Sequence, residues 1–84
     1  MTDPYNPYPS LQSFALGARV IVAATCAGWR QDCLGVVIST AEKVETVQGE
    51  EHLYWVKFDT PQHDLSDDGP YDRAQVLSRC LNAA

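Results

Sequence analysis

Alternation of apolar and polar side chains over residues 52–59 constrains the fold more than any other feature of this chain. The segment reads His-Leu-Tyr-Trp-Val-Lys-Phe-Asp, and a β-strand places Tyr54, Val56 and Phe58 on one face. Bulky apolar side chains in such a row need a second layer to cover them, because burying their surface is what stabilises a small domain. The sequence therefore predicts a sheet with one buried face.

Two earlier segments also have strand character. Residues 18–25 and 33–40 are rich in β-branched side chains, which favour an extended backbone. Gly35 interrupts the second segment and predicts a bend or a close approach of the backbone. The inward positions of these strands complete the expected core, with Val20, Val22 and Val36.

The polar segment at residues 41–50 has two interpretations. Its valines alternate with polar residues, so it extends the second strand into a hairpin that turns near Gln48-Gly49. A short helix over residues 41–47 is the alternative.

The tail after residue 71 is also open to two interpretations. Ala74, Leu77 and Leu81 have the spacing of one helical face. A brief strand, a single 3₁₀ turn at residues 74–76 and a last strand over residues 77–81 fit the same segment.

The length and the prolines divide the chain. Its 84 residues suffice for one small domain, and Pro4, Pro7 and Pro9 indicate an extended N-terminal arm. We therefore expect an arm over residues 1–15 and a barrel over residues 16–84. Short strands in so small a domain must close on themselves to remove their edges, so the predicted fold is an all-β barrel of about five strands.

Four short segments carry a resemblance to a known class of fold. They are Leu16–Val22 in the first strand, Leu34–Val37 in the second, Tyr54–Phe58 in the third and the terminal Ala74–Leu77. The first three contain the patterns Gly-x-Arg-Val, Gly-x-Val and Val-x-Phe. Together they resemble SH3-like small barrels. Bacterial examples include the variable chain of ferredoxin–thioredoxin reductase and the barrel of the nitrile hydratase β subunit, which act as accessory subunits or domains. The resemblance therefore implies a docking role.

A third barrel of this kind is the plasmid-encoded type II dihydrofolate reductase. That family has a Val-Gln-Ile-Tyr stretch on its active-site strand, and the stretch does not occur here. The reductase activity is therefore not carried over to this chain.

Cys26, Cys33 and Cys80 are the three cysteines. The odd number, together with an N-terminus that lacks a signal-peptide pattern, predicts three free thiols in a reducing, cytoplasmic compartment. A bond between Cys26 and Cys33 is the alternative. No apolar stretch approaches the roughly 20 residues that a membrane span needs.

Net charge and its distribution limit the partners. Six Lys and Arg against 11 Asp and Glu give a net charge of −5, which argues against nucleic acid and anionic membranes. Residues 59–72 contain five aspartates and no cation: Asp59, Asp64, Asp67, Asp68 and Asp72. This stretch is interpreted as a solvated loop in which aspartates form turns, as a patch for a basic partner, or as a hard-cation site to which His63 adds a nitrogen.

No pattern of catalysis or metal binding is present in the sequence. The cysteines and histidines lack the close pairs of zinc sites, and the chain has no nucleophile elbow, P-loop or dinucleotide fingerprint. Whether the chain is an enzyme stays uncertain, and the sequence favours a non-enzymatic role with no catalytic residue, cofactor or metal.

The predicted function is a protein-interaction module or an accessory subunit of a bacterial-type complex. Trp29, in the first loop, lines a ligand groove or else caps the end of the barrel. The expected partner-binding residues are Trp29, Leu53, Trp55, Asp64, Asp67, Asp68 and Tyr71. A homo-oligomeric barrel that binds a small molecule is the alternative.

Overall fold

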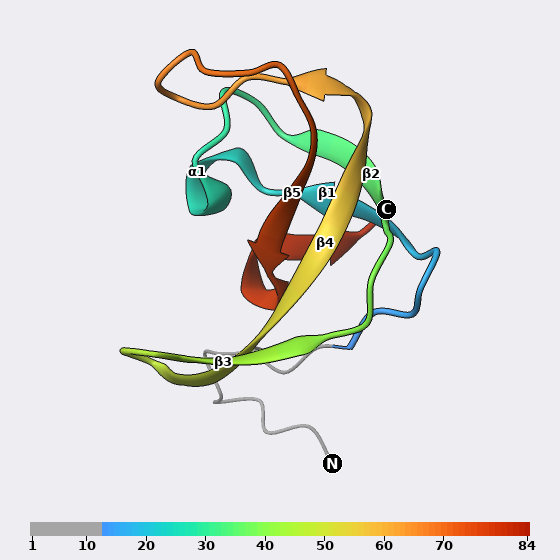
Figure 1. Cartoon of the computed structure of the whole chain (residues 1–84), viewed down its shortest axis with the longest axis vertical. Coiled ribbons are helices and arrows are strands. Elements are labelled where there is room, and N and C mark those ends of the chain that lie inside the picture. Colours follow the sequence, from blue (N-terminus) through green and yellow to red (C-terminus); the bar gives the residue numbers. More distant parts are fainter. Residues whose placement is uncertain (1–12) are drawn as a thin grey trace.

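The computed structural model of the protein describes residues 13–84, which form strands with almost no helix (Figure 1). The predicted arm over residues 1–15 therefore lies largely outside the described residues. One sheet curls into a half-barrel, which confirms the all-β class. The strands are β1 (Arg19–Val22), β2 (Cys33–Val37), β3 (Glu42–Thr46), β4 (Gly49–Gln62), β5 (Tyr71–Leu77) and β6 (Leu81–Ala83). The helical turns are α1 (Ala24–Ala27) and η1 (Ser78–Cys80).

β4 is the central strand, and Figure 1 shows it running along most of the molecule. Its Val56 pairs with Val37 of β2 on one edge and with Ala74 of β5 on the other. β3 pairs with the first part of β4 and lies at the end of the sheet. β1 joins β2 to β6, where Val22 faces Leu81, so the C-terminus returns to the first strand.

The inner face of β4 carries the predicted core side chains. Tyr54, Val56 and Phe58 are 2%, 0% and 4% exposed, whereas Trp55 on the opposite face is 40% exposed. The alternation predicted for this strand is therefore confirmed. The other core members are Val20, Val22, Trp29, Cys33, Val37, Val76, Cys80 and Leu81.

The predicted orientation of β2 is wrong by one residue. Val36 is only partly buried and lies on the outer side, while Gly35 and Val37 take the inward positions. Gly35 is required there, because a Cβ atom would lie 2.6 Å from the carbonyl oxygen of Lys57. The run over residues 36–38 is apolar throughout, and the inward glycine has no side chain, so the alternation could not identify the buried face.

The structure decides between the two interpretations of residues 41–50 and between those of the tail, and both segments form strands. Thr46 faces Gly49, so β3 and β4 form the expected hairpin with its turn at Val47-Gln48. The tail is a strand, a 3₁₀ turn and a strand, but the turn lies at residues 78–80 and not at residues 74–76. Within residues 13–84, no helix has the length and apolar character that a membrane crossing requires.

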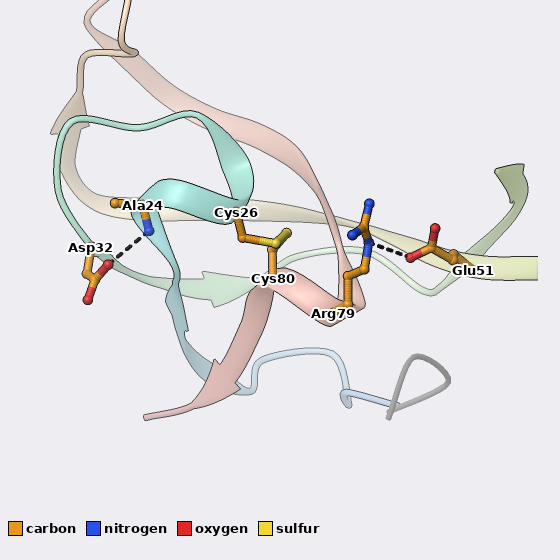
Figure 2. The surroundings of a disulfide bond; sticks show 6 residues. All are labelled: Ala24, Cys26, Asp32, Glu51, Arg79 and Cys80. Carbon is orange, nitrogen blue, oxygen red and sulfur yellow. Dashed lines mark hydrogen bonds and ion pairs between the residues drawn. A yellow bond between two sulfur atoms is a disulfide. The ribbon is translucent and has the colours of Figure 1, made fainter. Parts of the chain in front are cut away.

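Two boundaries differ from the predictions. The first strand ends at Val22, because the chain turns into α1, and the Ala24 amide there donates a hydrogen bond to Asp32 Oδ1 at 2.9 Å (Figure 2). The segment at residues 26–32 is thus not entirely loop. β4 is longer than the expected residues 52–59, because it has pairing partners at both ends, β3 at residues 49–53 and β5 at Gln62.

A disulfide links Cys26 of α1 to Cys80 of η1, with 5.5 Å between the Cα atoms (Figure 2). The prediction of three free thiols is therefore wrong, as is the alternative Cys26–Cys33 bond. Cys33 is the free cysteine, and it is buried. The bonded cysteines are 54 positions apart in sequence, so only the return of the tail to the first strand places them together.

Candidate interaction face

The side chains of β4 and β5 that point away from the core form one surface, which we call the outer face. The strand register fixes its members, because paired residues share a face. Three cross-strand pairs define the outer face: Leu53–Leu77, Trp55–Gln75 and Lys57–Arg73.

Trp55 lies at the centre of the outer face. Its backbone N–H and C=O groups both form hydrogen bonds. Its amide donates to Ser39 Oγ at 2.9 Å, and its carbonyl accepts from the Ile38 amide at 2.9 Å. Ile38 is itself 37% exposed. An exposed tryptophan beside an exposed isoleucine, on a fixed backbone, can bury a large apolar area without ordering a flexible loop.

Lys57 and Arg73 face each other directly across β4 and β5, and both are exposed. Like charges in directly opposite positions destabilise a sheet. Neither cation forms an ion pair with any residue of the described part, although the chain has a net charge of −5. The other cations are all paired: Arg19 with Asp59, Arg30 with Asp67, Lys43 with Glu50 and Arg79 with Glu51.

A hollow of about 200 Å³ borders the outer face beside the disulfide. It lies between α1 and β5, and its outer-face members are Leu53, Gln75 and Leu77. The rest of its wall consists of Cys26, Ala27, Val76 and Cys80.

The predicted acidic patch is largely engaged within its own loop. Asp64 Oδ1 accepts hydrogen bonds from the amides of Ser66 and Asp68 at 2.9 and 3.0 Å. Asp67 forms an ion pair with Arg30. This is the turn-forming use of aspartate. Of the predicted trio, Asp68 is the member whose carboxylate has no partner within residues 13–84.

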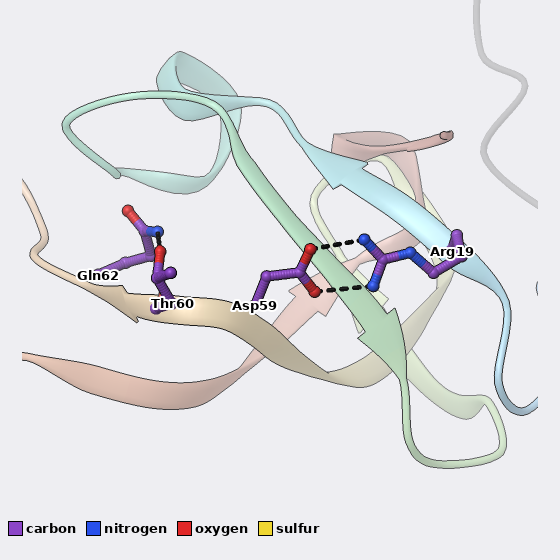
Figure 3. Close-up of polar contacts among 4 residues, drawn as sticks. All are labelled: Arg19, Asp59, Thr60 and Gln62. Atoms are coloured by element: carbon purple, nitrogen blue, oxygen red, sulfur yellow. Dashed lines mark hydrogen bonds and ion pairs between the residues drawn. The ribbon is translucent and has the colours of Figure 1, made fainter.

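Asp59, which begins the acidic stretch, is paired as well. Arg19 donates to both of its carboxylate oxygens, at 2.7 and 2.5 Å (Figure 3). These hydrogen bonds and the positive charge of Arg19 lower the pKa of Asp59. Two aspartates of the stretch therefore have cationic partners from outside it, Asp59 in Arg19 and Asp67 in Arg30.

Trp29 and Tyr71 contact each other near the end of β4, where Tyr71 pairs with Gln62. Trp29 is 8% exposed and packs edge to face on Phe58, with 4.9 Å between the ring centroids. It caps the barrel, which leaves little of its side chain for a partner. Tyr71 covers Trp29 at 5.7 Å and is 40% exposed.

Glu51 is a buried carboxylate that the sequence did not single out. It is 1% exposed, and its Oε1 lies 2.8 Å from Nε of Arg79 (Figure 2). Its Oε2 accepts from Thr46 Oγ1 at 2.5 Å. The ion pair joins the β3–β4 hairpin to η1. It also offsets the cost of burying the charge of Glu51, which would be large without a partner.

The structure brings together Leu53 and Trp55 of the predicted site, and it separates them from Trp29, Tyr71 and the aspartates. The sequence could also have placed Lys57 on the outer face, because it lies two positions after Trp55 on the same strand. Arg73 and Gln75 could not, because only the register of β5 brings them opposite these residues.

Comparison with known proteins gave no match to a protein family, to a curated protein or to a solved structure. Among residues 13–84, no three side chains of His, Cys, Asp or Glu are grouped so that they could hold a metal ion. What the outer face offers chemically is an apolar region around Trp55 with two cations, Lys57 and Arg73, together on one side of it.

Proposed function

We propose that the chain is a non-enzymatic interaction module or accessory subunit, built on an SH3-like barrel, that binds a protein partner through its outer face. The SH3-like assignment is supported by the curled half-barrel and by the 3₁₀ turn that leads into a last strand beside β1. Exposed tryptophan is the side chain most enriched at the energetic centres of interfaces.

The observation that carries the proposal concerns Lys57 and Arg73, which face each other beside Trp55. Neither has an anionic partner among residues 13–84. Two cations held opposite each other repel, and an acidic group of a partner placed between them relieves that repulsion. The partner surface that fits is therefore apolar at its centre and acidic at its rim. The acidic loop gives less support to a basic partner, because Asp64 and Asp67 already have contacts.

The alternative, a homo-oligomeric barrel that binds a small molecule, has less support from the hollow beside the disulfide in a single copy of the chain. Small-molecule sites are usually about 300–1,000 Å³ and enclosed. The hollow beside the disulfide has about 200 Å³, which suits one side chain better than a whole ligand.

The cytoplasmic location stays a prediction, and the Cys26–Cys80 bond weakens it. Stable disulfides belong mainly to oxidising compartments. The interaction proposal does not depend on the compartment.

The proposal is tested by affinity capture followed by binding titrations. Partners retained by the wild-type chain are titrated against Trp55→Ala, the double variant Lys57→Glu/Arg73→Glu and Val47→Ala. Trp55→Ala should weaken binding by about 2 kcal/mol at any salt concentration. Charge reversal should weaken it strongly at low salt and little near about 0.5 M, where the Debye length is about 4 Å.

Val47→Ala is the matched control, because Val47 is fully exposed at the tip of the hairpin and lies outside the outer face. It should bind as the wild type does. Equal binding by Trp55→Ala and by the wild type would exclude the outer face as the docking surface.

A further inference from the structure

β3 forms a free edge of the sheet. Only β4 pairs with it among the described residues, and Figure 1 shows it at one end of the molecule. Within residues 13–84, the other side of Glu42–Thr46 therefore presents unpaired backbone N–H and C=O groups, which can form a ladder with another strand.

The charges on β3 are incompletely matched within the monomer. Glu45 faces Glu50 directly across the hairpin, a like-charge pair that destabilises it. Lys43 reaches Glu50 diagonally at 3.7 Å, whereas Glu45 has no cationic partner in the described part of the chain. A cation on the free side of β3, opposite Glu45, would correct this.

Symmetry restricts which strand can supply that cation. When two copies of β3 pair antiparallel about a two-fold axis, the axis is perpendicular to the sheet and each residue stays on its own face. The pairing must then be centred on one residue. Centring it on Glu42, Lys43 or Glu45 places identical charges against each other. Centring it on Thr46 moves the pairing into the turn.

Centring the pairing on Val44 matches every position. Lys43 then faces Glu45 of the second copy, twice by symmetry. Glu42 faces Thr46, and Ala41 faces Val47, so no like charges are opposed. Each Glu45, which is opposed by Glu50 within its own chain, gains a lysine on its other side.

We propose that two copies of this chain pair antiparallel through β3, centred on Val44, to form one continuous sheet. The contact uses the edge of β3 and leaves the outer face of β4 and β5 open, so it does not rest on the proposed function. It involves about five residues per copy, and such small contacts are weak. The dimer should therefore depend on concentration and on salt.

The test is sedimentation equilibrium of the full chain over a range of concentrations at low salt. The wild type should show a monomer–dimer equilibrium. Lys43→Glu and Glu45→Lys should each weaken dimerisation about tenfold or more, because each places two like-charge pairs across the axis. An equimolar mixture of the two variants should dimerise again, since glutamates at positions 43 and 45 of one chain face lysines of the other.

Lys57→Glu is the matched control, because it makes the same charge change on the outer face and should leave dimerisation unchanged. The double variant Lys43→Glu/Glu45→Lys keeps the net charge and restores both pairs, so it should dimerise even if a single variant folds poorly. A wild type that stays monomeric up to about millimolar concentration, or a mixture of the two reversal variants that stays monomeric, would overturn the proposal.

Discussion

Phe58 and Trp55 lie on the same strand and meet opposite environments. Phe58 is 4% exposed and contacts Trp29, whereas Trp55 is 40% exposed on the outer face. The same chemical change should therefore have different consequences at these two positions.

Phe58→Ala should lower the free energy of unfolding by about 3–5 kcal/mol, because it removes a buried ring and leaves a cavity. Trp55→Ala should cost well under half of this, since much of its ring is already in water. Urea unfolding curves of both variants measure the difference. Equal midpoints for Phe58→Ala and the wild type would mean that the inner face is misassigned.

Asp59 gives a pH-dependent prediction at the same scale. Hydrogen bonds from Arg19 hold its pKa below the ordinary value of 3.8. A lowered pKa in the folded state means that the pair stabilises fully above the ordinary pKa. This stabilisation is lost as the pH falls through the lowered folded-state pKa.

Arg19→Met should therefore raise the pKa of Asp59 toward its ordinary value, as measured by an NMR titration of the Asp59 carboxyl group. The variant should also flatten the dependence of stability on pH below about pH 4. An Asp59 pKa that does not change would show that the pair does not persist in solution.

At the scale of elements, the disulfide holds α1 against η1. The adjoining Arg79 reaches the buried Glu51, so the two contacts of η1 join the first loop, the tail and the hairpin (Figure 2). Neither contact follows from local sequence, because each joins residues that only the completed fold brings together.

Thiol labelling tests this arrangement. After denaturation without reductant, the chain should take one tag, at Cys33, and after reduction it should take three. In the native state Cys33 should react slowly, since burial raises the pKa of its thiol. Reduction should cost about 2–4 kcal/mol of stability.

Cys26→Ser provides the control, because its stability should not respond to reductant. Three tags on the denatured, unreduced chain would exclude the Cys26–Cys80 bond and would restore the three-thiol prediction.

The sequence predicts the elements to different degrees. β4 was assigned to the correct face because its polar and apolar side chains alternate cleanly. β2 was not, because residues 36–38 are apolar throughout and Gly35 leaves its inward position empty. The tail was resolved only by its pairing with β4 and β1, since its periodicity fits a helix as well as a strand.

The candidate site was predictable in part for the same reason. Leu53 and Trp55 follow from the alternation of one strand. The neighbouring Arg73 depends on the register between β4 and β5, which is a long-range property. Composition predicts too large a role for the aspartates, because it does not reveal that Asp64 accepts hydrogen bonds from the backbone and that Asp67 is paired with Arg30.

At the scale of the whole molecule, one curled sheet separates a core from an outer face. The core side chains are covered by the curl of the sheet, while Trp55, Lys57 and Arg73 on the outer face are exposed. Lys57 and Arg73, beside Trp55, have no anionic partner within residues 13–84, and the partner that we propose for the outer face therefore has an acidic surface.

The most direct measurement is site-specific photocrosslinking in the cells that produce the chain, with the photoreactive side chain at position 55 or at position 47. Our account predicts a crosslinked partner from position 55, lost when Lys57 and Arg73 are both replaced by glutamate. From position 47 it predicts a crosslink to a second copy of the chain and none to that partner. A partner crosslinked equally from both positions, or none from position 55, would contradict it.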